Sequence, residues 1–142
     1  MSAIVDKIYE QAKRLGACDK FKGTETEEEL IDLFLTAYGQ EFCMDNHFPS
    51  LATLRYFKRF DLESRGIYID AGAITLHNPE RVYLAGRTSA TINCDSLKSR
   101  NCITLLRGSK AVINASGWAV AFVKTEAGST CIKNAQDNAL IL

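Results

Sequence analysis

The C-terminal half of the chain repeats a pattern of alternating apolar residues and turn residues about every eight positions. From Ala73 the units read AITLHNPE, RVYLAGRT, SATINCDS, CITLLRGS, KAVINASG, WAVAFVKT and STCIKNAQ, with insertions at 97–101 and 126–128 and a final NALIL. The fourth position is always apolar: Leu76, Leu84, Ile92, Leu105, Ile113, Ala121, Ile132 and Ile141. The second position is apolar except for Thr130: Ile74, Val82, Ala90, Ile103, Ala111, Ala119, Thr130 and Ala139. Units this short bury their apolar side only by stacking on one another.

Each unit predicts a strand of about five residues followed by a tight corner. The second and fourth positions face the same side of such a strand, so they would form the interior. Two architectures remain open, a short β-solenoid with parallel, in-register strands and an antiparallel β-sandwich. The recurring small residue at the second position favours the solenoid, because equivalent side chains then stack coil over coil. Asn93 and Asn114 share one repeat position, which predicts a stacked polar ladder.

The N-terminal half has a helical pattern instead. Apolar residues at helical spacing predict a first helix over residues 4–15, ended by Gly16. Thr26 and Glu29 form a capping box for a second helix, which Gly39 would close. A third, short helix is expected from Ser50 to about residue 60.

The two halves also differ in charge. Residues 1–66 carry nine basic and twelve acidic side chains, and residues 67–142 carry eight and five. The sequence therefore predicts an α+β fold with a helical N-terminal cap region over residues 1–66. A compact short-repeat β-solenoid follows over residues 67–142. Helices of this kind would cover the exposed strand edges at one end of the coil stack.

The composition excludes several classes of protein. Seventeen basic and seventeen acidic residues give no net charge, which excludes a bulk polyanion binder but not a local basic patch. The apolar runs are far shorter than the roughly 20 residues that cross a bilayer, so no membrane partner is expected. The N-terminus does not resemble a signal peptide. Five cysteines in irregular spacing then predict reduced thiols and a cytoplasmic location.

Two candidate binding features remain. Arg55, Lys58 and Arg59 stand at helical spacing on one face of the third helix, where they could contact nucleic-acid phosphates. The alternative is a solvated basic face opposite the apolar side of the same helix. Trp118 follows a glycine at a corner of the repeat, and it is either an exposed interface anchor or a packed side chain.

We expect no metal, no cofactor and no catalytic residue. Cys43 and His47 form a C-x-x-x-H pair, but a zinc site usually needs four ligands, and the chain has one other histidine, His77. No nucleophile is paired with a base, and no glycine-rich phosphate loop occurs. An enzyme would require an unrecognised site that brings Cys43, His47 or His77 to a carboxylate.

The octads seen in 89–94 and 110–115, of the form Ala-x-Ile/Val-x-Ala/Cys, resemble the short-octad repeat proteins of gut Bacteroides and of their phages and prophages. The resemblance covers residues 73–142. It implies a β-solenoid and a mobile-element origin, and it transfers no activity and no catalytic residue.

We therefore expect a non-enzymatic structural or protein-interaction module that associates with itself. The apolar C-terminal end, residues 139–142, is the expected contact between copies. A host or phage protein is the other partner considered. Nucleic-acid binding through the basic third helix and an enzyme with an unrecognised site are the alternatives.

Overall fold

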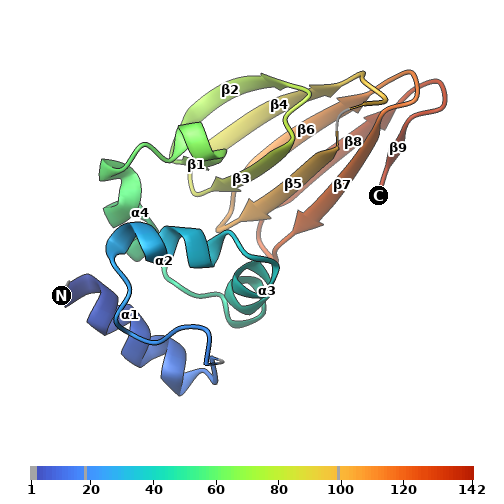
Figure 1. Ribbon diagram of the computed structural model, residues 1–142. Helices are drawn as coiled ribbons and strands as arrows, with labels where there is room; N and C mark the ends of the chain where they lie inside the picture. The colour runs from blue at the N-terminus through green and yellow to red at the C-terminus, as the bar shows by residue number, and fades with distance from the viewer. Residues whose placement is uncertain (1–2, 18, 99) are drawn as a thin grey trace. The chain divides into compact units, whose positions relative to one another are not determined.

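The computed structural model describes residues 3–17, 19–98 and 100–142 (Figure 1). Contacts divide the chain into two compact units, Met1–Ser50 and Leu51–Leu142. Each unit is described separately below.

The first unit is helical. Its elements are α1 (Ala3–Arg14), α2 (Glu27–Phe34) and α3 (Ala37–Asn46). The first helix buries one apolar face formed by Val5, Ile8 and Ala12. The predicted capping box is confirmed at the start of α2. The Glu29 amide donates to Thr26 Oγ1, and the Thr26 amide donates to Glu29 Oε1, both at 3.1 Å.

The predicted end of the second helix is wrong. Helix α2 ends at Phe34, and Gly39 lies in the first turn of α3 instead of closing α2. Thr36 caps this new helix, because its Oγ1 accepts a hydrogen bond from the Gly39 amide at 3.1 Å. A Cβ atom at position 39 would lie 2.2 Å from the Leu33 carbonyl oxygen, so this helix start requires glycine.

The second unit begins with α4 (Leu51–Tyr56) and two 3₁₀ turns, η1 (Phe57–Arg59) and η2 (Glu63–Arg65). Nine strands follow within the described residues and alternate between two parallel sheets. The five-stranded sheet has the order β1-β3-β5-β7-β9, and the four-stranded sheet has the order β2-β4-β6-β8. The strands are β1 (Ile67–Ile69), β2 (Gly72–His77), β3 (Arg81–Ala85), β4 (Thr88–Cys94), β5 (Asn101–Leu106), β6 (Lys110–Ala115), β7 (Val120–Thr125), β8 (Thr130–Ala135) and β9 (Leu140–Ile141).

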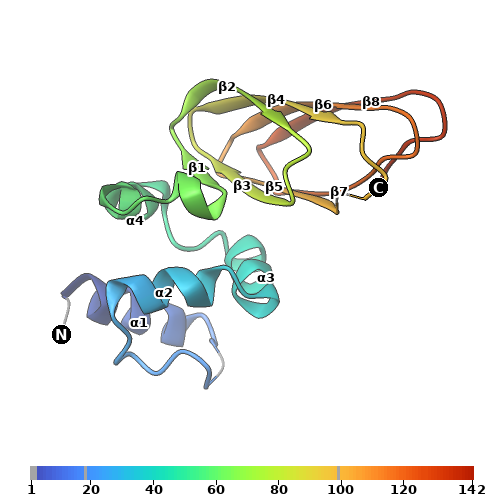
Figure 2. The same cartoon turned by 45° about the horizontal axis from the view of Figure 1, so that its top comes forward.

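This arrangement is the predicted β-solenoid, and the antiparallel sandwich is excluded because every strand pair is parallel. Figure 2 shows the two sheets of the second unit as facing layers joined by corners. Each coil contributes one strand to each sheet. In the four-stranded sheet Gly72 pairs with Thr88, Ser89 with Lys110, and Lys110 with Thr130. The coils therefore advance by 16, 21 and then 20 residues.

The interior lies between the two sheets. The fourth repeat position supplies its centre, since Leu84, Ile92, Leu105 and Ile113 are fully buried. Small side chains from the second position, such as Ala90 and Ala111, lie beside them in the same core. The predicted common interior is thus confirmed.

The eight-residue spacing does not hold to the end of the chain. From β6 onward the strands begin at residues 110, 120, 130 and 140, because the corners between them contain four residues. The expected inward position of Ile132 is wrong, since Ile132 pairs with the outward Val112 and is 54% exposed. Cys131 packs against the core, and Lys133 takes the position that Ile113 holds one coil earlier.

Candidate protein-interaction surfaces

Exposed apolar side chains gather on the last strands. Eight large hydrophobic side chains are exposed in the described part of the chain, and five of them lie between residues 118 and 142: Trp118, Phe122, Ile132, Leu140 and Leu142. Scattered apolar side chains are ordinary on a protein surface, but a cluster indicates an interaction site.

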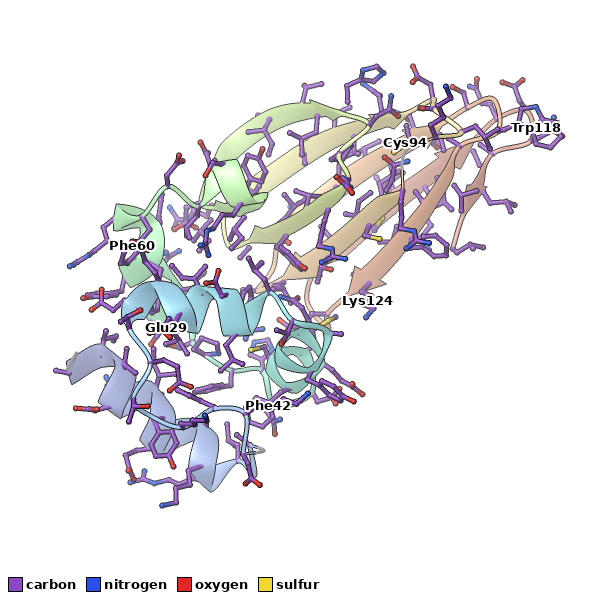
Figure 3. The ribbon with its side chains drawn as sticks, in the orientation of Figure 1. Glu29, Phe42, Phe60, Cys94, Trp118 and Lys124 are labelled. Atoms are coloured by element: carbon purple, nitrogen blue, oxygen red, sulfur yellow. The ribbon has the colours of Figure 1, made fainter. Side chains whose placement is uncertain are left out.

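Three of these side chains form one patch on the outer face of the five-stranded sheet. Phe122 points outward, because its neighbours Ala121 and Val123 pack into the core. Val120 pairs with Leu140, and the Leu142 amide donates to the Ala121 carbonyl at 2.8 Å, which sets Leu142 beside Phe122. We call Val120, Phe122, Leu140 and Leu142 the apolar patch. Lys124, also on β7, lies exposed beside it (Figure 3).

Trp118 lies at the corner between β6 and β7. Figure 3 shows its side chain pointing away from the strands, and 63% of the residue is exposed. Of the two interpretations considered from the sequence, packing inside the corner is therefore wrong. An exposed tryptophan at a corner can anchor a contact, but Trp118 precedes β7 and is not on the two strands of the apolar patch.

The predicted ladder of asparagine side chains is confirmed and is longer than expected. Asn114 Nδ2 donates to Asn93 Oδ1 at 3.1 Å, and Asn134 Nδ2 donates to Asn114 Oδ1 at 3.0 Å. A groove of about 220 Å³ lies along these side chains. Amide, hydroxyl and carboxylate groups line it, together with Cys94 and Ala115.

A second polar cluster lies at the β2 end of this face. Asp95 Oδ2 lies 2.9 Å from His77 Nε2, and Asp95 Oδ1 accepts a hydrogen bond from Asn78 Nδ2 at 2.7 Å. The hydrogen bonds from Asn78 and His77 lower the pKa of Asp95. Cys94 is the neighbouring thiol, but it points into the core and burial raises its pKa. The cluster therefore does not combine a histidine with a reactive thiolate.

The three basic residues that the sequence predicts on one helix lie in α4 and η1, and two of them already have partners. Arg55 Nε contacts Asp70 Oδ2 at 2.5 Å, and Arg59 lies over the Tyr56 ring, 4.0 Å from its centre. The helix itself ends at Tyr56, so Lys58 and Arg59 belong to the 3₁₀ turn η1. Two of the three candidate residues thus have structural contacts within the second unit.

The Arg55–Asp70 pair fixes the first corner of the solenoid. Asp70 Oδ1 also accepts a hydrogen bond from the Arg87 amide at 2.8 Å. Gly86 makes room for this carboxylate, because a Cβ atom there would lie 2.3 Å from Asp70 Oδ1. The Arg55 hydrogen bond, and next the Arg87 amide, lower the pKa of Asp70 against the opposing effect of burial.

This lowered pKa gives a prediction for Asp70→Asn. A carboxylate with a lowered pKa stabilises the fold above its ordinary pKa of 3.8, and this contribution is lost as the pH falls below that value. We expect the variant to be less stable than the parent at neutral pH, with a difference that narrows below pH 3.8. Urea unfolding at several pH values measures this, with the exposed Asp61→Asn as the control. A difference that stays constant with pH would contradict the assignment.

A buried ion pair joins the two following corners, β5–β6 and β7–β8. Arg107, between β5 and β6, pairs with Glu126, between β7 and β8, and both side chains are 3% exposed. The Arg107 amide also donates to Glu126 Oε1 at 2.9 Å. Each of these groups is held by its neighbour in the adjacent coil, which is typical of a structural contact.

Cys43 and His47 lie in different environments at the end of α3. Cys43 is buried in α3, whereas His47 is an exposed residue that caps the end of this helix in the left-handed conformation. No group of three or more metal-ligating side chains occurs among residues 3–17, 19–98 and 100–142. Cys43, Cys94, Cys102 and Cys131 take part in no disulfide among the described residues, which do not include Cys18.

No protein-family model, curated protein or solved structure matches this chain. The resemblance to the short-octad repeat proteins therefore stays a prediction. Within the described residues, no helix combines the length and the apolar character needed to cross a bilayer.

Proposed function

We propose that the chain is a non-enzymatic protein-interaction module that associates with itself through the apolar patch. The observation that carries this proposal is the concentration of exposed apolar side chains on β7 and β9. Phe122, Leu140 and Leu142 are 46%, 53% and 57% exposed on one continuous sheet face. The patch includes the C-terminal residues that the sequence singled out for contact between copies.

Two copies would pair face to face by this surface. A two-fold axis would set the outer face of one five-stranded sheet against the same face of the other. The apolar side chains then form the centre of the contact, and polar side chains such as Lys124 remain at its rim. A host or phage protein with its own apolar face would use the same surface.

Self-association is tested by size-exclusion chromatography with light scattering. We expect the parent chain to form a dimer or a larger species. The double variant Phe122→Ser with Leu142→Ser should dissociate, with a dissociation constant raised by about 100-fold or more, because central apolar anchors supply most of the binding energy. Leu97→Ser is the matched control. Leu97 is 72% exposed, but it lies in the corner between β4 and β5 and not on the apolar patch. A parent chain that stays monomeric at high concentration would contradict the proposal.

The alternatives have less support. Nucleic-acid binding would rely on Arg55 and Arg59, which are engaged by Asp70 and Tyr56. An enzyme would need a reactive group at the His77–Asp95 cluster, where the adjacent Cys94 thiol is buried. The free thiols suit a reducing compartment, and we propose a cytoplasmic location for this reason.

A further inference from the structure

Strand β8 is an edge of the four-stranded sheet. In the described chain β6 pairs with one side of it, and no strand pairs with the other. Every residue from Thr130 to Ala135 except Cys131 is exposed. Unpaired backbone N–H and C=O groups along such an edge can bind an extended segment as an added strand.

Lys133 determines what kind of strand can be added. It pairs with Ile113, which is fully buried, so Lys133 occupies an inward position at the mouth of the core. Cys131, two residues earlier, packs against that core, and the nearby charge of Lys133 moderates the rise in its pKa that burial causes. A strand laid on β8 would place its own inward side chain over the Lys133 ammonium. An apolar side chain there would bury an unpaired charge at a large cost.

A strand from a second copy of this chain would not bring a carboxylate to Lys133. None of the nine strands contains an aspartate or a glutamate within the described residues. The opposite edge strand, β2, carries Ile74 and Leu76 at its inward positions. Coil-on-coil stacking of two copies would therefore cover Lys133 with aliphatic groups.

We propose that the β8 edge binds an extended segment of another protein as a parallel strand, with a carboxylate of that segment facing Lys133. The asparagine ladder gives an independent second contact. No side chain in the described residues donates to Asn134 Oδ1, so a donor side chain at the next position of the bound segment can continue the ladder. The bound strand thus carries an acidic residue facing inward, followed by an amide or hydroxyl side chain facing outward. This surface is separate from the apolar patch.

The repeat itself supplies the probe for a test. Residues 108–117, synthesised with Ile113→Glu, form a peptide with the carboxylate inward and Asn114 in register with the ladder. The matched control is the same peptide with Val112→Glu, which has the same charge but carries it on the outward face. Nuclear magnetic resonance titration of the isotope-labelled chain reports both affinity and location. We expect shifts along Thr130–Ala135 and binding about tenfold tighter for the inward carboxylate.

Charge reversal on the protein completes the test. In the variant Lys133→Glu, the preference for the Ile113→Glu peptide should disappear, and a peptide with Ile113→Lys should bind instead. Equal binding of the two glutamate peptides, absence of binding along β8, or a preference unchanged by Lys133→Glu would each overturn the proposal. Phe122→Ser with Leu142→Ser should leave peptide binding unaffected, which separates this test from the self-association experiment.

Discussion

Ile113→Ala is expected to lower the free energy of unfolding by about 2–5 kcal/mol, because the removed atoms leave a cavity in a tightly packed interior. Ile113 is fully buried, and it packs between strands on both sides, paired with Ile92 in β4 and Lys133 in β8. The core combines large aliphatic side chains with small ones such as Ala90 and Ala111, and it lies between two sheets, so neighbouring residues have little freedom to fill the space. Chemical denaturation measures the effect.

The control is Ile132→Ala, at a residue that the eight-residue repeat treats as equivalent to Ile113. Because Ile132 lies on the outer face and is 54% exposed, its truncation should cost less than about 1 kcal/mol. If the two substitutions lower the free energy of unfolding equally, the pairing that places Lys133, and not Ile132, beside Ile113 is wrong.

Glu126→Ala is expected to cost about 3–5 kcal/mol, because it leaves the buried Arg107 guanidinium without its counter-charge. The substitution also removes the acceptor of the Arg107 amide at 2.9 Å. Both side chains are 3% exposed, so solvent cannot replace the lost partner. Thermal or chemical unfolding of the variant gives the loss directly.

Two further variants separate the ion pair from other effects. Glu80→Ala removes an exposed carboxylate from another corner and should change stability by no more than about 0.5 kcal/mol. Glu126→Leu combined with Arg107→Met should cost less than Glu126→Ala, since it removes both charges together. If the double variant is as unstable as Glu126→Ala, the unpaired charge of Arg107 does not cause the loss of stability.

The repeat predicted which residues face inward better than it predicted the spacing of the strands. Alternation along a strand has a period of two, so lengthening a corner by two residues leaves every inward position inward. Ala121 and Ile141 therefore belong to the core as expected, although the spacing has become ten residues. A one-residue error reverses the two faces, and this is what happened at Ile132.

That single shift also hid two features of the candidate site. The eight-residue frame places Ile132 at the inward position, so it does not predict that Lys133 faces inward. It also gives Asn134 a different repeat position from Asn93 and Asn114, so the predicted ladder contains only two members. The spacing Asn93–Asn114–Asn134 follows the coil lengths of 21 and 20 residues, and a search for asparagines at that spacing would have found it.

In the helical half, the sequence-based prediction failed for a different reason. Helix α3 was missed because its apolar residues do not follow one face, and Gly39 looked like the end of the preceding helix. Thr36 was the available signal, since threonine is a common N-cap residue. The basic helix could not be assessed from sequence either, because the partner of Arg55 is Asp70, fifteen residues later and in another element.

The coil-by-coil pairing of the strands also determines how local opening varies along the second unit. Each strand is bonded only to the strands of the adjacent coils, so contacts are lost in order along the stack. The coil containing β8 and β9 has neighbours on one side only, and nearly all of β8 is exposed. Fraying there breaks bonds to a single coil, whereas opening β4 or β6 breaks bonds on both sides. Local opening therefore becomes harder from either end of the described stack toward its centre, and the surfaces proposed for binding lie on strands at one of these ends.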